Sequence, residues 1–155
     1  MTNRTAYIGL GSNLGDRKGN LIKATALLAE RAGTVLALSS LYETEPWGFE
    51  SANQFLNAVV VLSTSLSPME LLDTTRLIEL EMGRITKSDG CYHDRPIDID
   101  LLLIDQLVMH NERLTLPHPL MHQRRFVMEP LAEVAPDMRH PLSGKTMQAL
   151  LNELA

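Results

Sequence analysis

Asp98 and Asp100 are separated by a single isoleucine in the apolar stretch IDIDLLLIDQL, residues 97–107. Alternate residues of a β-strand point to the same face, so a strand here would bring both carboxylates to one spot. Carboxylate oxygens suit Mg²⁺, which accepts one or two of them and completes its coordination with water and substrate phosphates. A solvent-facing polar stripe is the alternative, but the aliphatic neighbours favour a strand buried on both faces, where unpaired carboxylates are unfavourable. The pair therefore predicts a magnesium site that acts on a phosphate-bearing substrate.

Arginine side chains could complete such a site, because a polyphosphate also needs fork-shaped donors that neutralise and align it. Arg95, three residues before Asp98, is the best placed. Taken singly, each arginine is equally consistent with an exposed surface residue, so the prediction depends on their convergence in the fold. The candidates are Arg84, Arg95, Arg113, Arg124 and Arg125.

Aromatic residues make up only 5% of the chain, which makes their positions informative. Trp47 and Phe55 flank a loop with Pro and Gly, Tyr92 precedes Arg95, and Phe126 follows an arginine pair. Two such rings can hold a flat heterocycle between them while an amide such as Asn57 reads its edge. Core positions for the phenylalanines and a structural amide for Asn57 remain open alternatives.

Two further features allow weaker predictions. His118, between two prolines, could contact a phosphate, although a loop histidine without such a role is the alternative. The segment GLGSNLGD contains Gly9, Gly11 and Gly15 but matches neither of the common phosphate-binding glycine patterns. These glycines are therefore interpreted as turn and close-packing positions.

The elements that would position these residues alternate between strands and helices. Ala6 to Leu10 favours a strand that enters a turn-prone segment, Gly11 to Asp16. Asp16 can cap a helix that extends through Arg31 and that Gly33 would end as a left-handed stop. Val35 to Tyr42 predicts a second strand, and the more continuously apolar Phe55 to Ser63 predicts a third, central one.

The second half continues the same alternation. Ser67, Pro68 and Glu70 form a capping-box pattern for a helix that runs to about Met82 and ends at Gly83. The strand with the two aspartates follows, and Pro130 is expected to open a short helix. Residues 146–154 predict a final amphipathic helix. The order β, α, β, β, α, β indicates an α+β fold with a ferredoxin-like core, whose mainly antiparallel sheet is covered by helices and carries appended short elements.

The composition narrows the classes of protein. With 155 residues and 45% apolar side chains, residues 1–155 fit one domain around one core. We find neither a leader pattern nor an apolar run long enough to span a membrane, so a cytoplasmic protein is expected. The single Cys91 suits a reducing compartment. A formal net charge of -5 argues against a nucleic-acid-binding surface.

Several separate segments together resemble one family, the hydroxymethyl-dihydropterin pyrophosphokinases. They follow one another along nearly the whole chain: YIGLGSNLGD, YETEPWG, FLNAVV, IELEMGR, DRPIDIDLLL and LTLPHPLMHQRRFVMEPLAEVAP. The resemblance implies transfer of the β,γ-diphosphate of ATP to the hydroxymethyl group of a reduced pterin in folate biosynthesis. It implies ATP and the pterin as partners, with no obligatory protein partner.

The resemblance also implies roles for individual residues. Asp98 and Asp100 would hold two Mg²⁺ ions that bridge ATP and the pterin hydroxymethyl group. The pterin would contact Thr44, Glu45, Pro46, Trp47, Phe55, Asn57, Asp98 and Phe126, with the two phenylalanines forming a stack. ATP would contact Glu79, Arg84, Arg95, Leu101, Arg113, Thr115, His118 and Arg124, of which Arg84 and Arg95 would also be catalytic. Trp47 and residues 84–95 match loops that close over the substrates in the family.

The chain departs from the family pattern in and near one of these loops. His93-Asp94 stands where a Gly-Pro is common, and Tyr92 stands where a tryptophan is frequent. Arg76 replaces a frequent glutamine, and Thr86 stands where a second loop arginine can occur.

Two other functions use the same residues in different ways. A metal-dependent phosphohydrolase would need Asp98 and Asp100 but no pterin pocket. A ligand-binding or regulatory module would keep the fold without turnover. The products formed from ATP, Mg²⁺ and the reduced pterin distinguish these functions.

Overall fold

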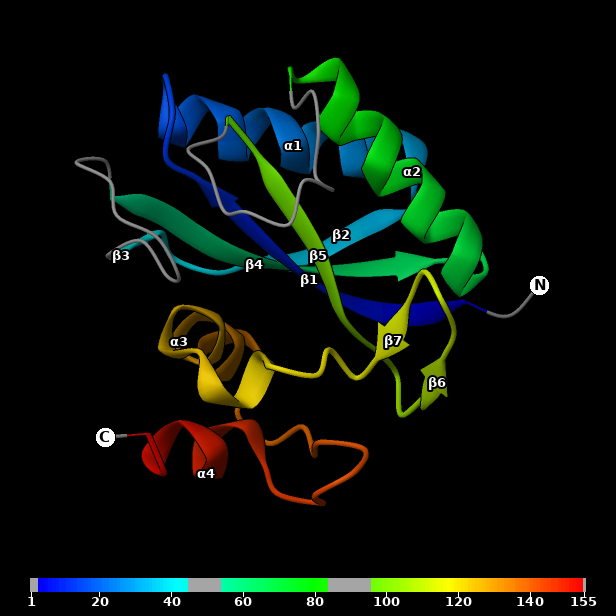
Figure 1. The fold of residues 1–155 in the computed structure, drawn as a ribbon, viewed down its shortest axis with the longest axis vertical. Coiled ribbons are helices and arrows are strands. Elements are labelled where there is room, and N and C mark those ends of the chain that lie inside the picture. Colours follow the sequence, from blue (N-terminus) through cyan, green and yellow to red (C-terminus); the bar gives the residue numbers. More distant parts are fainter. Residues whose placement is uncertain (1–2, 45–53, 84–95, 155) are drawn as a thin grey trace.

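An antiparallel sheet lies at the centre of the fold (Figure 1). The computed structural model describes residues 3–44, 54–83 and 96–154. Four strands form the sheet in the order β2-β4-β1-β5, and a short strand, β3, also pairs with β4. Their bounds are β1 Arg4–Ser12, β2 Thr34–Leu38, β3 Tyr42–Thr44, β4 Phe55–Thr64 and β5 Asp98–Ile104.

In the described residues, helices lie on both faces of the sheet, and α4 packs on α3 (Figure 1). Helices α1, Arg17–Arg31, and α2, Pro68–Glu81, cover one face, and α3, Arg125–Val134, with α4, Met147–Asn152, lies on the other. With β3 set aside, the order β1-α1-β2-β4-α2-β5 is the split βαβ arrangement. The expected α+β, ferredoxin-like fold is therefore confirmed.

The alternation of side chains along β1 explains why the core has two parts. Ala6, Ile8 and Leu10 are buried against α1 and α2. The intervening residues face α3 and α4, where Val59 and Leu102 pack with residues of both helices. Each face of the sheet therefore has its own hydrophobic cluster.

Local signals set the start of α1 and both ends of α2 as expected. The Asp16 side chain accepts a hydrogen bond from the Gly19 backbone N–H at 3.1 Å. In α2, the Ser67 side chain accepts from the Glu70 N–H while the Glu70 carboxylate accepts from the Ser67 N–H, which completes the capping box. Gly83 follows α2 with φ +99°, a conformation that favours glycine.

The role expected for Gly33 was wrong. The residue is not in the left-handed region, because Gly15, Gly83 and Gly144 are the described glycines with positive φ. A Cβ atom at Gly33 would instead collide with the carbonyl oxygen of Ser63 in β4. Glycine is needed here for the close approach of two backbones.

Two element boundaries also differ from expectation. The strand predicted over Val35 to Tyr42 is divided into β2 and β3, and the intervening Ser39 donates its backbone N–H to Val59 of β4. Pro130 lies inside α3 rather than at its start. Because proline has no N–H, one helical hydrogen bond is missing there, and burial of the apolar face of α3 stabilises the helix instead.

Short elements extend the fold beyond β5. The hairpin of β6, Met109–His110, and β7, Thr115–Leu116, lies beside β5, and a 3₁₀ turn, Met121–Gln123, leads into α3. The final helix is shorter than predicted and is capped by Thr146. None of the helices in the described residues has the length and apolar character needed to cross a membrane.

Candidate functional site

The two aspartates of β5 face the same side of the sheet. Ile97 and Ile99 are buried in the cluster beneath α1 and α2. Asp98 and Asp100 alternate with them and are half-buried, so they lie on the opposite face, the one that α3 covers. The predicted arrangement of both carboxylates on one face of a strand is therefore present.

Strand register aligns these carboxylates with the residues predicted to contact the heterocycle. Asp98 is opposite Gly11 of β1, and Gly11 is opposite Asn57 of β4. Asp100 is likewise opposite Gly9. Because both intervening residues are glycines, no side chain stands on β1 between the carboxylates and the amide.

Gly11 is in close contact with the predicted pterin residues. A Cβ atom added there would lie 3.0 Å from Oδ1 of Asn57 and 3.4 Å from Cδ1 of Phe55. The amide oxygen and the aromatic ring therefore lie directly over the backbone of β1. At these two glycines β1 adds no side chain of its own, and Asn57 and Phe55 pack over Gly11 while Leu102 packs over Gly9.

Asn57 is held in place by the neighbouring short strand. Its side chain is 4% exposed, and its Nδ2 donates to Thr44 Oγ1 at 2.6 Å. Thr44 is also opposite Phe55 in the pairing of β3 with β4. The structure thus brings together Thr44, Phe55 and Asn57, while Glu45, Pro46 and Trp47 lie outside the described residues.

Helix α3 contributes an aromatic side chain and its preceding residue an arginine. The half-buried Phe126 packs on the cluster between α3 and the sheet. Arg124 is 9% exposed, and its guanidinium carbon lies 5.7 Å from the centroid of the Phe126 ring. This cation–π contact places a candidate phosphate ligand beside a candidate pterin ligand.

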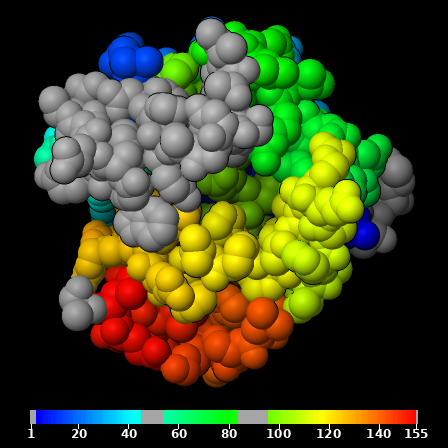
Figure 2. All heavy atoms as spheres, viewed as in Figure 1, coloured from blue at the N-terminus to red at the C-terminus, as the bar shows by residue number. Residues whose placement is uncertain are grey.

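Most of the residues expected to bind ATP surround the outer edge of β5. Leu101 lies in β5, Thr115 lies in the adjacent β7, and the His118 backbone N–H donates to Leu102 O at 2.9 Å. Figure 2 shows a hollow on this face, bordered by α2 in green and the 105–125 segment in yellow. Arg84 and Arg95 lie outside the described residues.

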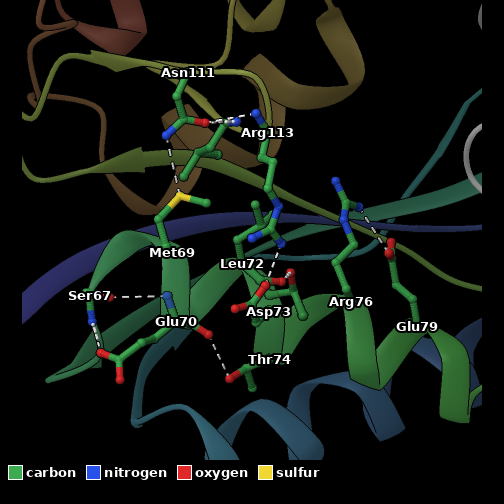
Figure 3. A network of polar contacts seen from close by, with 12 residues as sticks. Ser67, Met69, Glu70, Leu72, Asp73, Thr74, Arg76, Glu79, Asn111 and Arg113 are labelled. Atoms are coloured by element: carbon green, nitrogen blue, oxygen red, sulfur yellow. Dashed lines mark hydrogen bonds and ion pairs between the residues drawn. The ribbon is translucent and has the colours of Figure 1, made fainter.

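One face of α2 forms the wall of this region (Figure 3). Asp73, Arg76 and Glu79 follow one another at helical spacing. Arg113 reaches from the β6–β7 hairpin and forms an ion pair with Asp73, and Arg76 pairs with Glu79 at 3.2 Å. Two guanidinium groups therefore lie on successive turns of α2, that of Arg76 from the helix itself and that of Arg113 through its ion pair.

Glu79 is buried between α2 and β5. The residue is 2% exposed, and its Oε2 accepts the backbone N–H of Ile99 at 2.8 Å. Sequence reasoning could not anticipate this bond, because it joins residues of two elements that meet only in the folded chain. Arg125, in contrast, forms an exposed i,i+4 pair with Glu129, which matches the surface alternative.

The donor set fits a metal only in combination with a substrate. Among the described residues, no group of three or more His, Cys, Asp and Glu side chains could hold a metal ion. Two half-buried carboxylates on one strand are sufficient for Mg²⁺ when phosphate and water supply the remaining oxygens. Asp98 and Asp100 therefore suit Mg²⁺ that arrives with a polyphosphate.

Gly9 and Gly11 were interpreted as turn or close-packing positions, and close packing is confirmed at Gly11. Both lie within β1 rather than in a turn. Sequence reasoning did not place them opposite the two aspartates, because that placement depends on strand register.

Comparisons with known proteins agree with this arrangement. Residues 7–136 match the family described as 7,8-dihydro-6-hydroxymethylpterin-pyrophosphokinase (HPPK). A 2-amino-4-hydroxy-6-hydroxymethyldihydropteridine pyrophosphokinase of Porphyromonas gingivalis is 54% identical over 87% of this chain and 92% of its own length. The protein of the same name from Bacillus subtilis is 47% identical over 85% of this chain and 78% of its own length.

Larger proteins contain a similar region. The folic acid synthesis protein fol1 of Schizosaccharomyces pombe is 38% identical over 98% of this chain, which corresponds to 21% of that protein. A crystal structure of Plasmodium falciparum HPPK-DHPS has the same fold, with a TM-score of 0.78 at 19% identity over 98% of this chain and 44% of that one. The family match and the high identities agree: this chain belongs to the 7,8-dihydro-6-hydroxymethylpterin-pyrophosphokinase family.

Proposed function

We propose that this protein transfers the β,γ-diphosphate of ATP to the hydroxymethyl group of 6-hydroxymethyl-7,8-dihydropterin, giving AMP and the pterin diphosphate in folate biosynthesis. The observation that carries the proposal is the row formed by Asn57, Gly11 and Asp98 on three adjacent strands. A heterocycle over β4 and a nucleotide along the outer edge of β5 would meet at the carboxylates. Membership of the family supports the same reaction.

Asp98 and Asp100 are the proposed metal ligands. They would hold two Mg²⁺ ions, which when bound neutralise the phosphate charge and make the substrate hydroxyl easier to deprotonate. Their backbone positions are fixed by pairing with the glycines of β1. The backbone that carries the carboxylates is therefore in place before the substrates arrive.

The pterin would lie between Phe55 and Phe126, with Asn57 at its polar edge. The bond from Asn57 Nδ2 to Thr44 sets the orientation of the amide, and the amide oxygen lies over Gly11. This fixed orientation would select the donor and acceptor pattern of the heterocycle. In the proposal, Thr44, Glu45, Pro46 and Trp47 complete the pterin contacts.

The nucleotide would lie along β5 and the hairpin beside it. Arg113 and Arg124 would neutralise the phosphates, with Thr115, His118 and the backbone at Leu101 as further contacts. The pterin hydroxymethyl oxygen would form a bond to Pβ as the bond between Pβ and the bridging oxygen to Pα breaks, and AMP would leave with that oxygen. Alignment and charge neutralisation are sufficient for such a transfer, and no covalent protein intermediate is required. Arg84 and Arg95 belong to the same proposal as catalytic residues.

The decisive experiment supplies ATP, Mg²⁺ and the reduced pterin to residues 1–155 as one catalytic unit and measures all phosphate-containing products. Equal amounts of AMP and pterin diphosphate are expected. Release of orthophosphate without pterin diphosphate would favour the phosphohydrolase instead. Binding of both ligands without any product would favour a binding module. We also propose a cytoplasmic location, because the single cysteine suits a reducing compartment.

A further inference from the structure

In the described part of the chain, the strand that carries Asp98 and Asp100 lies at one end of the sheet. Along the main path of the sheet, β5 is the terminal strand and pairs with β1. In an antiparallel pair, successive residues direct their backbone groups alternately toward the neighbouring strand and away from it. The Ile99 N–H is directed away from β1, because it donates to Glu79 of α2 at 2.8 Å. The backbone groups of Asp98 and Asp100 consequently face the glycines of β1.

The backbone of this short segment is therefore held from both sides. β1 holds β5 opposite the two aspartates, and Glu79 holds it at the residue between them. The bond joins a carboxylate to a backbone N–H and has the length of a charge-assisted hydrogen bond. Such a bond restrains the pleat that aims both aspartate side chains in one direction.

Glu79 is in turn oriented by Arg76. Its side chain is almost fully buried, where an ionised carboxylate requires partners. Oε2 accepts from Ile99, and Oε1 lies 3.2 Å from Nη1 of Arg76, one turn earlier on the same helix. The Glu79 carboxylate of α2 is thus held in position to accept a hydrogen bond from the edge of β5.

We propose that Glu79 is a positioning residue: it sets the geometry of the two metal-binding carboxylates through the backbone of Ile99. This inference rests on the proposed function and goes beyond the ATP contact that the resemblance implied for Glu79. Loss of Glu79 should therefore weaken metal binding by Asp98 and Asp100. This effect acts through the backbone and does not require contact between Glu79 and either aspartate.

Three variants separate this role from others. Glu79→Ala removes the acceptor, whereas Glu79→Gln keeps a carbonyl oxygen that can accept from Ile99 and loses the charge. Glu81→Gln is the matched control, because Glu81 lies on the same helix and pairs with Arg31 of α1 on the surface.

The first measurement is amide hydrogen exchange at Ile99 in the protein without metal or substrate. We expect Glu79→Ala to accelerate exchange at Ile99 about tenfold, as for the loss of one hydrogen bond to a charged group. Glu79→Gln should give a smaller increase, and Glu81→Gln none. This measurement does not depend on the reaction, so its outcome is separate from that of the proposed function.

The second measurement is the binding of Mn²⁺, in place of Mg²⁺, to the protein with an unreactive ATP analogue. Glu79→Ala should weaken Mn²⁺ binding and raise the Mg²⁺ concentration needed for half-maximal turnover, each about tenfold. Glu79→Gln should restore most of both. Unchanged exchange at Ile99 in Glu79→Gln and Glu79→Ala would overturn the proposal. Unchanged Mn²⁺ binding in Glu79→Ala despite faster exchange would overturn it too, and the exchange rate at Ile99 in Glu79→Gln carries the test if the alanine variant does not fold.

Discussion

Gly11 lies between Asp98 on one neighbouring strand and Asn57 on the other. Its missing side chain leaves room for the Asn57 amide and the Phe55 ring, both of which lie over its backbone. A methyl group at this position would displace them by a few tenths of an ångström. Gly9 has more room, because the nearest atoms to an added Cβ belong to Leu102, at 3.5 Å.

We therefore expect Gly11→Ala to weaken pterin binding by about 1 kcal/mol, the scale of a small overpacking error, and to leave ATP binding nearly unchanged. Gly9→Ala should weaken pterin binding less, because its methyl group makes only ordinary contacts. Calorimetric titration with each ligand measures both effects. If both variants weaken pterin binding equally, crowding of Asn57 and Phe55 is not the cause, and the prediction is wrong.

Each of the two aspartates is expected to be indispensable. Asp98→Ala and Asp100→Ala should each abolish AMP formation without unfolding the protein, since each removes a proposed metal ligand from the surface of a strand. Asp105→Asn is a suitable control: it removes a carboxylate just beyond β5 and keeps a residue type that tolerates the φ of 49° at that position. Normal turnover in either alanine variant would refute the assignment of that residue.

At the scale of elements, α3 holds the strand that carries Thr44. The carboxylate of Glu133 accepts hydrogen bonds from the Ser40 backbone N–H and hydroxyl and from the Tyr42 hydroxyl at 2.7 Å. The bond to Glu133, with a smaller contribution from burial, raises the pKa of Tyr42 to about 12. Among the described residues, β3 consists of three residues and pairs with β4, so the attachment to Glu133 stabilises its position.

Glu133→Ala should consequently raise the KM for the pterin several-fold, with little effect on the KM for ATP. Each lost hydrogen bond contributes about 1 kcal/mol, and Thr44 is the contact between β3 and Asn57. Glu129→Ala, one turn earlier on α3, is the control, because Glu129 pairs with Arg125. Hydrogen exchange at residues 42–44 should increase only in the Glu133 variant, and a parallel rise in both KM values would argue for a general loss of structure.

Whether an element could be predicted from the sequence depends on how far apart in the sequence its contacting residues lie. The capping box of Ser67 and Glu70 was predictable, because its partners lie within one helical turn. The pairing of β3 was not, because it depends on Glu133 and β4, which are distant in the sequence. Gly33 and Gly83 both follow a helix, yet only Gly83 adopts a positive φ, and no local pattern separates the two.

The same limit applies to the candidate site. The spacing of Asp98 and Asp100 was sufficient to place both on one face of a strand. The bond from Ile99 to Glu79 and the packing of Asn57 over Gly11 could not be predicted, because they depend on the register of three strands and on the position of α2. Residues 45–53 and 84–95, which include several predicted contacts, lie outside the described part of the chain.

At the scale of the whole molecule, two ionisable groups link stability to pH. His140 is buried, and its Nδ1 accepts the N–H groups of Leu142 and Ser143. Burial, aided by nearby His122, lowers the pKa of His140 below its ordinary value of 6.5. Burial opposes ionisation of Glu133, but hydrogen bonds from Tyr42 and Ser40 outweigh it and lower the pKa of this carboxyl below 4.5.

These shifts predict loss of stability in two steps on acidification. The unfolded chain binds a proton at His140 before the folded protein does, so the free energy of unfolding should fall as the pH decreases below 6.5. Glu133 contributes fully above 4.5, and its contribution is lost as the pH falls through its lower, folded-state value. Urea unfolding across this range should show that His140→Gln removes the first step and that Glu133→Gln reduces the second, to which Glu70 and Glu81, whose pKa values are also lowered, contribute. Identical pH profiles for wild type and His140→Gln would contradict the assignment of the first step.

The contacts along the outer edge of β5 also bear on self-association. An unpaired strand edge offers its N–H and C=O groups to any other extended chain and can nucleate aggregation. On this edge, the Ile99 N–H is occupied by Glu79 and the Leu102 carbonyl by the backbone of His118. A second chain could add a strand here only by displacing both partners. The bonds that keep the aspartate-bearing strand in place thus also prevent the sheet from growing at this edge.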